Sequence, residues 1–137
     1  MLDHGPLSDA CANEKILPLY ILEPDLWRQP DVSYRHFLHL QHYLSQLDDM
    51  FNKKGSKLVV KVGDAFSVLK SLANRHNIKT IFSHYETWNK FSKDRDAVIR
   101  KWTEENSIDW KEYQQNGVVR NLNSRDGWST LWHSHMR

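Results

Sequence analysis

Short apolar runs alternate with longer amphipathic segments along this chain, and this alternation restricts the fold more than any other feature. Four runs have the length and the β-branched or aromatic content of strands, at residues 17–22, 58–62, 80–82 and 108–113. Three segments with apolar residues at helical spacing lie between them. The order β-α-β-α-β-α-β with short connections predicts an α/β fold, in which helices flank an open parallel sheet through right-handed crossovers.

Each predicted helix has an apolar stripe, and two have a clear start signal. Ser33 can cap the first helix, which is expected to extend to about residue 51. Its stripe comprises Phe37, Leu40, Leu44, Leu47 and Phe51. Asp64 can cap the second helix, whose stripe comprises Phe66, Leu69, Leu72 and Ala73. The third helix is expected to present Phe91, Arg95, Val98 and Trp102 on one face. A short helix is also expected near residues 7–12.

Length and composition place the chain among small globular domains. The 137 residues suit one domain, and 39% hydrophobic residues suffice for one modest core. No apolar run approaches the roughly 20 residues of a membrane span, and the first 15 residues do not resemble a signal peptide. The single cysteine, Cys11, leaves no internal disulfide and no cysteine cluster for zinc. These features predict a cytoplasmic protein without membrane contact.

Polar and aromatic side chains gather in the loop at residues 83–89, directly after the third predicted strand. Glu86, Thr87 and Asn89 offer hydrogen-bond donors and acceptors, while Tyr85 and Trp88 offer flat faces. Open parallel sheets bind ligands at the carboxyl ends of their strands, and a conjugated ring with polar substituents would suit this mixture. The alternative is a loop that caps the following helix and shields its strand.

Other candidate sites are weaker. The turn Gly63–Asp64 is either a cap or a seat for phosphate at a helix N-terminus. His36, His39 and His42 are three residues apart, whereas helical zinc sites prefer a spacing of four, so no metal site is predicted. Ser83 and His84 would point to opposite faces of a strand. We therefore predict no catalytic residue in this chain.

The net charge of +2 is too small to indicate nucleic-acid binding by itself. Six tryptophans are a high count for this length, and three of them, Trp110, Trp128 and Trp132, lie near the C-terminus. One interpretation is that these tryptophans cover the core or a partner domain. The other is that they stack on nucleic-acid bases.

Several short segments, taken in order over about residues 3–132, resemble the N-terminal α/β domain of the DNA photolyase and cryptochrome family. The segments lie at residues 3–7, 19–24, 33–38, 58–64, 84–98, 115–120 and 125–128. They include Leu58-Val59-Val60 with Gly63-Asp64, and His84 and Glu86-Thr87 with Asn89 and Arg95-Asp96. Their order and spacing are more specific than any one motif.

The resemblance implies a flavoprotein that repairs ultraviolet-damaged DNA with light, or a related photoreceptor. In that family FAD sits in a C-terminal helical domain, and the N-terminal domain can hold an antenna chromophore such as a folate, a deazaflavin or a flavin. On this basis His84, Glu86, Thr87 and Asn89 are expected to contact the antenna. Residues 1–116 would form the α/β domain, and residues 117–137 a linker toward the FAD-binding helical domain. Arg120 and Arg125 would contact that domain or DNA phosphate.

Three departures from the family pattern bear on these expectations. The family's opening strand would precede Asp3 and is missing, so the strands at 17–22 and 80–82 should lack the neighbour between them. The helical domain is also absent, so we expect a fragment that does not by itself perform the family's carbon–carbon lyase reaction, and whether it is an enzyme is left open. Tyr85 and Trp88 stand where the family has an acid and a small residue, so Trp88 could fill part of the antenna cavity. The alternatives are a stand-alone nucleotide-binding or regulatory α/β module and a non-functional remnant.

Overall fold

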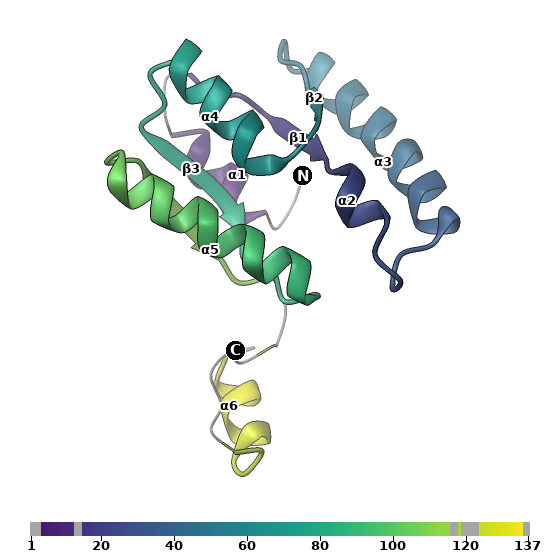
Figure 1. Cartoon of the computed structure of the whole chain (residues 1–137), viewed down its shortest axis with the longest axis vertical. Helices are drawn as coiled ribbons and strands as arrows, with labels where there is room; N and C mark the ends of the chain where they lie inside the picture. The colour runs from purple at the N-terminus through teal and green to yellow at the C-terminus, as the bar shows by residue number, and fades with distance from the viewer. Residues whose placement is uncertain (1–3, 13–14, 116–117, 119–123, 136–137) are drawn as a thin grey trace.

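The computed structural model describes residues 4–12, 15–115, 118 and 124–135. Its elements, shown in Figure 1, follow the predicted order. They are α1 (Gly5–Ala10), β1 (Leu19–Leu22), α2 (Pro24–Trp27), α3 (Tyr34–Asn52), β2 (Val59–Val62), α4 (Ala65–Arg75), β3 (Thr80–His84), α5 (Lys90–Glu105), β4 (Asp109–Tyr113) and α6 (Trp128–His135). The four predicted strands and three main helices are therefore present.

Local chemistry explains where the main helices begin. Ser33 is the N-cap of α3, and its backbone N–H donates to Nδ1 of His36 at 3.3 Å. Asp64 caps α4, because its side chain accepts a hydrogen bond from the Ser67 amide at 2.8 Å. Asn89 caps α5 in the same way, through the Ser92 amide at 3.0 Å. Each cap satisfies an amide that has no partner inside its own helix.

Two helices were not predicted. Helix α2 begins at Pro24, because proline fits the first turn of a helix, where its missing N–H costs nothing. Helix α6 lies within residues 117–137, which the sequence predicted as a linker, and it stands apart from the rest of the chain in Figure 1.

The strands form two separate parallel pairs. Strand β1 pairs with β2, with Leu22 opposite Val62, and β3 pairs with β4, with Ser83 opposite Glu112. Among the described residues, β1 and β3 are not hydrogen-bonded to each other. Over these residues the predicted open sheet is therefore split into two hydrogen-bonded halves.

One helical layer joins the two halves. Ala65 of α4 and Ile99 and Trp102 of α5 form the buried cluster at its centre. Ile21 of β1 and Ile81 of β3 both pack against this cluster, so both halves share one apolar core. The predicted face of α5 is wrong by one position at Val98, which is 52% exposed, because the helix turns Ile99 inward instead.

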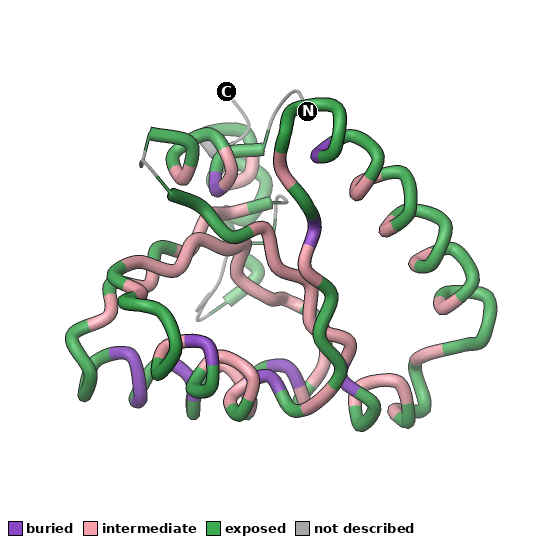
Figure 2. The backbone as a smooth tube through the Cα atoms, turned by 90° about the horizontal axis from the view of Figure 1, so that it is seen from above, coloured by how far each residue is buried: buried purple, intermediate pink, exposed green. Residues whose placement is uncertain are grey.

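The opposite face of the β1–β2 pair is open. Alternation along the strands puts Leu22 and Val62 on one face, and Leu22 lines a pocket together with residues at the start of α3. Val62 on that face remains 66% exposed, and the apolar stripe of α3 is only half-buried until Phe51. Figure 2 shows α3 along one side of the molecule with most of its turns exposed. The chain exposes 10264 Å², whereas a compact protein of this mass exposes about 7,500 Å².

Within the described residues, the structure contains no helix that is both long enough and apolar enough to span a bilayer.

Candidate functional site

Polar and aromatic side chains meet at the carboxyl ends of β1 and β3. Glu23 directly follows β1, and Glu86 lies two residues beyond β3. Arg95 and Asp96, from the second turn of α5, face them across this edge. We call these four residues the charged edge cluster. It occupies the edge where open parallel sheets bind ligands.

Arg95 is the centre of the charged edge cluster. Its Nη1 donates to Oε2 of Glu23 at 2.6 Å, and its Nε donates to Oδ1 of Asp96 at 2.9 Å. Oε1 of Glu23 accepts from the Ala65 amide at 3.2 Å, so this carboxylate also holds the first turn of α4. Glu23 is 3% exposed. A buried carboxylate needs this pairing, and the ion pair therefore fixes the end of β1 to both α4 and α5.

Glu86 is the member of the cluster that Arg95 does not bind directly. Burial raises the pKa of the Glu86 carboxyl group; the Arg95 charge opposes this rise, while Asp96 and Glu23 add to it. Burial likewise raises the pKa of the neighbouring Asp96, even though Arg95 pulls it down. On β1, burial raises the pKa of Tyr20, and the charges of Glu23 and Glu86 raise it further. Glu86 is thus a half-buried carboxyl group whose raised pKa comes mainly from its removal from water.

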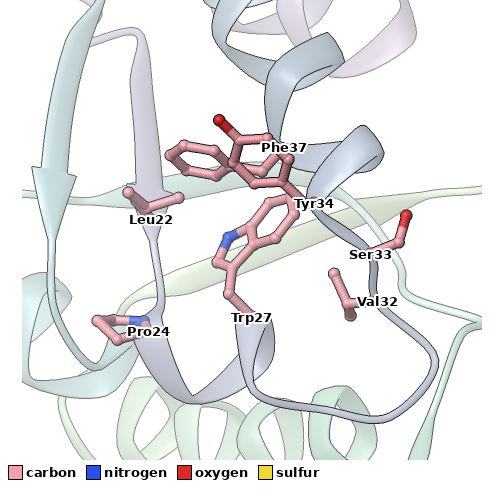
Figure 3. Close-up of a pocket in the computed structure, with 7 residues that line it drawn as sticks. All are labelled: Leu22, Pro24, Trp27, Val32, Ser33, Tyr34 and Phe37. Atoms are coloured by element: carbon pink, nitrogen blue, oxygen red, sulfur yellow. The ribbon is translucent and has the colours of Figure 1, made fainter.

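An aromatic pocket lies beside the charged edge cluster. Its volume is about 370 Å³. It is lined by Leu22, Pro24, Trp27, Val32, Ser33, Tyr34 and Phe37. Figure 3 shows the indole of Trp27 reaching from α2 toward the rings of Tyr34 and Phe37. The Trp27 and Phe37 rings meet edge to face, with centroids 5.3 Å apart, and Tyr34 stacks on Phe37 at 6.5 Å. The Trp27 indole N–H is buried and has no acceptor among the described residues.

Asn89 connects the 83–89 loop to the rim of this pocket. Its Nδ2 donates to both carboxylate oxygens of Asp31, at 3.1 and 3.3 Å, and Asp31 immediately precedes the pocket residue Val32. Its Oδ1 caps α5. Both polar atoms of the Asn89 side chain therefore bind other parts of the protein. The cap on α5 is the structural role that the sequence analysis gave as the alternative to ligand binding. The loop, the pocket and the charged edge cluster are consequently neighbours at one edge of the sheet.

The other predicted contact residues have different surroundings. His84 ends β3, where its ring meets that of His4 with centroids 4.8 Å apart. Burial, followed by the charge of His4, lowers the pKa of His84. Thr87 is half-buried in the loop. The structure thus brings Glu86 to the charged edge cluster and Asn89 to the rim of the pocket, and directs His84 toward the α1 side.

Sequence reasoning missed Glu23 and Trp27 as parts of the site. For Glu23 the sequence did contain a clue in its position. An acid that directly follows a buried strand lies at the same sheet edge as the 83–89 loop. Arg95 and Asp96 were noted, but only as part of a helix face and of the family motif.

The weaker candidates proved structural. The amides at the start of α4 are held by Asp64 and Glu23, so the Gly63–Asp64 turn offers no seat for phosphate. Ser83 accepts a hydrogen bond from the indole of Trp110 at 2.9 Å. Arg125 is exposed, and Arg120 lies outside the described residues. Over the described part of the chain, no three His, Cys, Asp or Glu side chains are placed to hold a metal ion.

A family model and a solved structure both match this chain. A family model described as DNA photolyase matches residues 1–125. The crystal structure of an archaeal photolyase from Sulfolobus tokodaii matches with a TM-score of 0.78 and 27% identity over 96% of this chain. That structure contains two FAD molecules and is described as implying a novel light-harvesting cofactor. The present chain spans 31% of the length of that photolyase. A search of curated proteins finds no match.

Proposed function

Because the chain belongs to the DNA photolyase family, we propose that it is an antenna-type domain that binds a planar chromophore at the carboxyl edge of its strands. The observation that carries this proposal is the aromatic pocket beside the charged edge cluster. A pocket with apolar and aromatic walls and a few polar groups at its rim is the common design for binding a conjugated ring. Its volume of about 370 Å³ suits a ring system rather than a whole dinucleotide.

The residues present fit such a group. Trp27, Tyr34 and Phe37 supply flat apolar surface for a ring. Glu86 supplies an acceptor for a ring N–H. Thr87 and His84 remain proposed contacts from the same loop. Asn89 would act indirectly, by holding the loop against Asp31.

The chromophore would belong to the folate, deazaflavin or flavin class. The archaeal relative supports a flavin, since its structure is described as having two FAD molecules, with the implication of a novel light-harvesting cofactor. When bound, such a group absorbs light and passes on the excitation energy. The chain would not be catalytic alone. Repair of ultraviolet-damaged DNA would need the family's FAD-bearing helical domain as its partner.

Uptake of a chromophore tests this proposal. Purified protein is dialysed against methenyltetrahydrofolate, a deazaflavin or riboflavin, and the bound ligand is measured by absorbance. We expect stoichiometric uptake of at least one of them, and a loss of about tenfold or more in affinity for Trp27→Ala, since base-like rings gain roughly 1–3 kcal/mol from an aromatic platform. Trp128→Ala, which removes an exposed tryptophan on α6 far from the pocket, should bind as wild type. Failure of all three ligands to bind would refute the proposal.

The alternative of a nucleotide-binding module has less support. Phosphates usually bind at helix N-termini, and at α4 those amides are already held by two carboxylates. Titration calorimetry with ATP and AMP should therefore show no tight binding. The remnant hypothesis would require the absence of a cooperative unfolding transition.

A further inference from the structure

Helix α1 packs against the carboxyl ends of β3 and β4. His84 of β3 and Tyr113 of β4 lie opposite each other in the strand register, so their side chains share one face of the pair. The ring of His84 meets the ring of His4 with centroids 4.8 Å apart. A Cβ placed on Gly5 would lie 3.1 Å from Cδ1 of Tyr113, so the backbone of α1 lies directly against that ring.

Tyr113 also holds the second half of α1. Its hydroxyl donates a hydrogen bond to Oδ2 of Asp9. This hydrogen bond raises the pKa of the Tyr113 hydroxyl, and burial and the charges of Asp9 and Asp109 raise it further. The hydroxyl therefore keeps its proton at neutral and acid pH, and the donor in this contact does not change there.

His4 has a second role, as the N-cap of α1. Its Nδ1 accepts a hydrogen bond from the Leu7 amide at 3.1 Å. A ring nitrogen can accept only while it carries no proton, so this geometry requires a neutral His4 with its proton on Nε2. Protonation of Nδ1 would remove the acceptor from the Leu7 amide. It would also set a positive charge beside helix amides that already carry positive partial charge.

Protonation of His84 would act in the same direction. Burial, followed by the charge of His4, lowers the pKa of His84, so the docked arrangement favours a neutral ring. Two protonated rings in contact would repel each other. A base whose pKa is lowered by docking stabilises the docked state above its ordinary pKa, and this stability is lost as the pH falls. Both histidines therefore favour docking at neutral and alkaline pH and oppose it in acid.

The other charged groups on this face do not compensate the two histidines. Alternation along β4 places Asp109 and Lys111 on the same face as Tyr113. These two side chains pair with each other at 3.7 Å, and Lys111 lies over the Phe82 ring. On α1 itself, the one acid is Asp9, which binds Tyr113. Within the described residues, no carboxylate forms an ion pair with either histidine.

We propose that α1 is a pH-sensitive strap, docked across the ends of β3 and β4 while the His4–His84 pair is neutral and released from them when the pair is protonated. Release is expected as the pH falls from about 8 to about 5, the range in which histidine side chains change their charge. It uncovers the rings of His84 and Tyr113, next to the 83–89 loop. The strap does not depend on the proposed antenna function.

Two-dimensional NMR of the full chain between pH 8 and pH 5 tests the proposal. Gly5 is the reporter, because its contact with the Tyr113 ring gives its protons a ring-current shift. We expect this shift to disappear as the pH falls, and the Leu7 amide to lose its protection from hydrogen exchange. The amides of α4 and α5 at the core should stay protected. A Gly5 shift that is constant over this range would overturn the proposal.

His4→Asn separates protonation from capping, because asparagine is a good N-cap residue and does not titrate. In this variant the Gly5 shift should persist from pH 8 to pH 5. His39→Asn, which removes an exposed histidine from α3, should show the wild-type transition. A wild-type transition in His4→Asn, or loss of the transition in His39→Asn, would contradict the role of His4.

His84→Phe decides the case in which His4→Asn fails to dock at any pH. Phenylalanine keeps an aromatic ring against His4 but cannot be charged, so the repulsion between the two rings is removed. The midpoint of the Gly5 transition should therefore move to lower pH than in wild type. An unchanged or higher midpoint would overturn the proposal that the histidine pair controls docking.

Discussion

At the scale of single residues, Arg95 determines whether two acids can remain buried at the sheet edge. Glu23 and Asp96 are both largely removed from water, and each binds this one guanidinium. Burial by itself disfavours the charged form of Arg95, but hydrogen bonding to Glu23 and the charges of both acids raise its pKa overall. The ion pair joins positions 72 residues apart in the chain. No local sequence rule predicts such a pair, which explains why sequence reasoning did not assign Glu23 to the site.

Removing Arg95 should strongly destabilise the protein. Arg95→Ala leaves two carboxylates buried without a counter-charge, and this costs about 3–5 kcal/mol in free energy of unfolding. Arg28→Ala serves as the matched control, because its pair with Asp25 is exposed and worth about 0–1 kcal/mol. Urea unfolding at pH 7 measures both. Equal losses for the two variants would contradict the assigned role of Arg95.

The charge on Glu86 should make stability depend on pH. Its pKa is raised in the folded state, so the stability linked to this group is present below its unfolded pKa and is lost as the pH rises through the folded pKa. Glu86→Gln removes that loss. The variant should therefore melt at a higher temperature than wild type at pH 8, and the difference should disappear near pH 4. Thermal melts at the two pH values check this, and a wild type more stable than the variant at pH 8 would refute it.

At the scale of elements, the starts of helices could be predicted from the sequence, because neighbouring residues determine them. Ser33 and Asp64 were identified as caps from residue type and position alone, and both cap helices in the structure. The prediction failed where one signal has two interpretations. Pro24 ends a strand and also begins a helix. Val98 and Ile99 are both β-branched, and only packing against α4 decides which of them is buried.

Asn89 has two separable roles, as the cap of α5 and as the tie to Asp31. Asn89→Ala loses the cap and should cost about 1 kcal/mol. Asn89→Asp keeps the capping oxygen but sets a carboxylate against Asp31. Its defect should shrink with added salt, whereas the defect of the alanine variant should not. Urea unfolding at two salt concentrations distinguishes these cases, and a salt-independent defect in the aspartate variant would exclude a tie to Asp31.

At the scale of the whole molecule, the two strand pairs are held together by helices rather than by backbone hydrogen bonds. The cluster of Ala65, Ile99 and Trp102 is the shared core, and β1 and β3 do not pair with each other. The sequence predicted this split only through the family resemblance, because alternating strands and helices give the order of elements and not the pairing of strands.

This architecture predicts uneven protection from hydrogen exchange. Amides of α4 and α5 near the core should exchange most slowly, and amides on the unpaired edges of β1 and β3 should exchange quickly. The native protein should also bind the hydrophobic dye ANS at the open face that includes Val62. Uniform protection across all four strands together with no dye binding would show that the halves form one closed sheet.

The central claim is that the carboxyl edge of β1 and β3 is a binding site for a planar chromophore. The most direct measurement is a two-dimensional NMR titration of labelled protein with riboflavin. The account predicts chemical-shift changes confined to residues 20–37 and 84–96, with the largest change at the Trp27 indole N–H. Shifts confined to other surfaces, such as α6 or the outer face of α4, or saturating riboflavin without any shift, would contradict it.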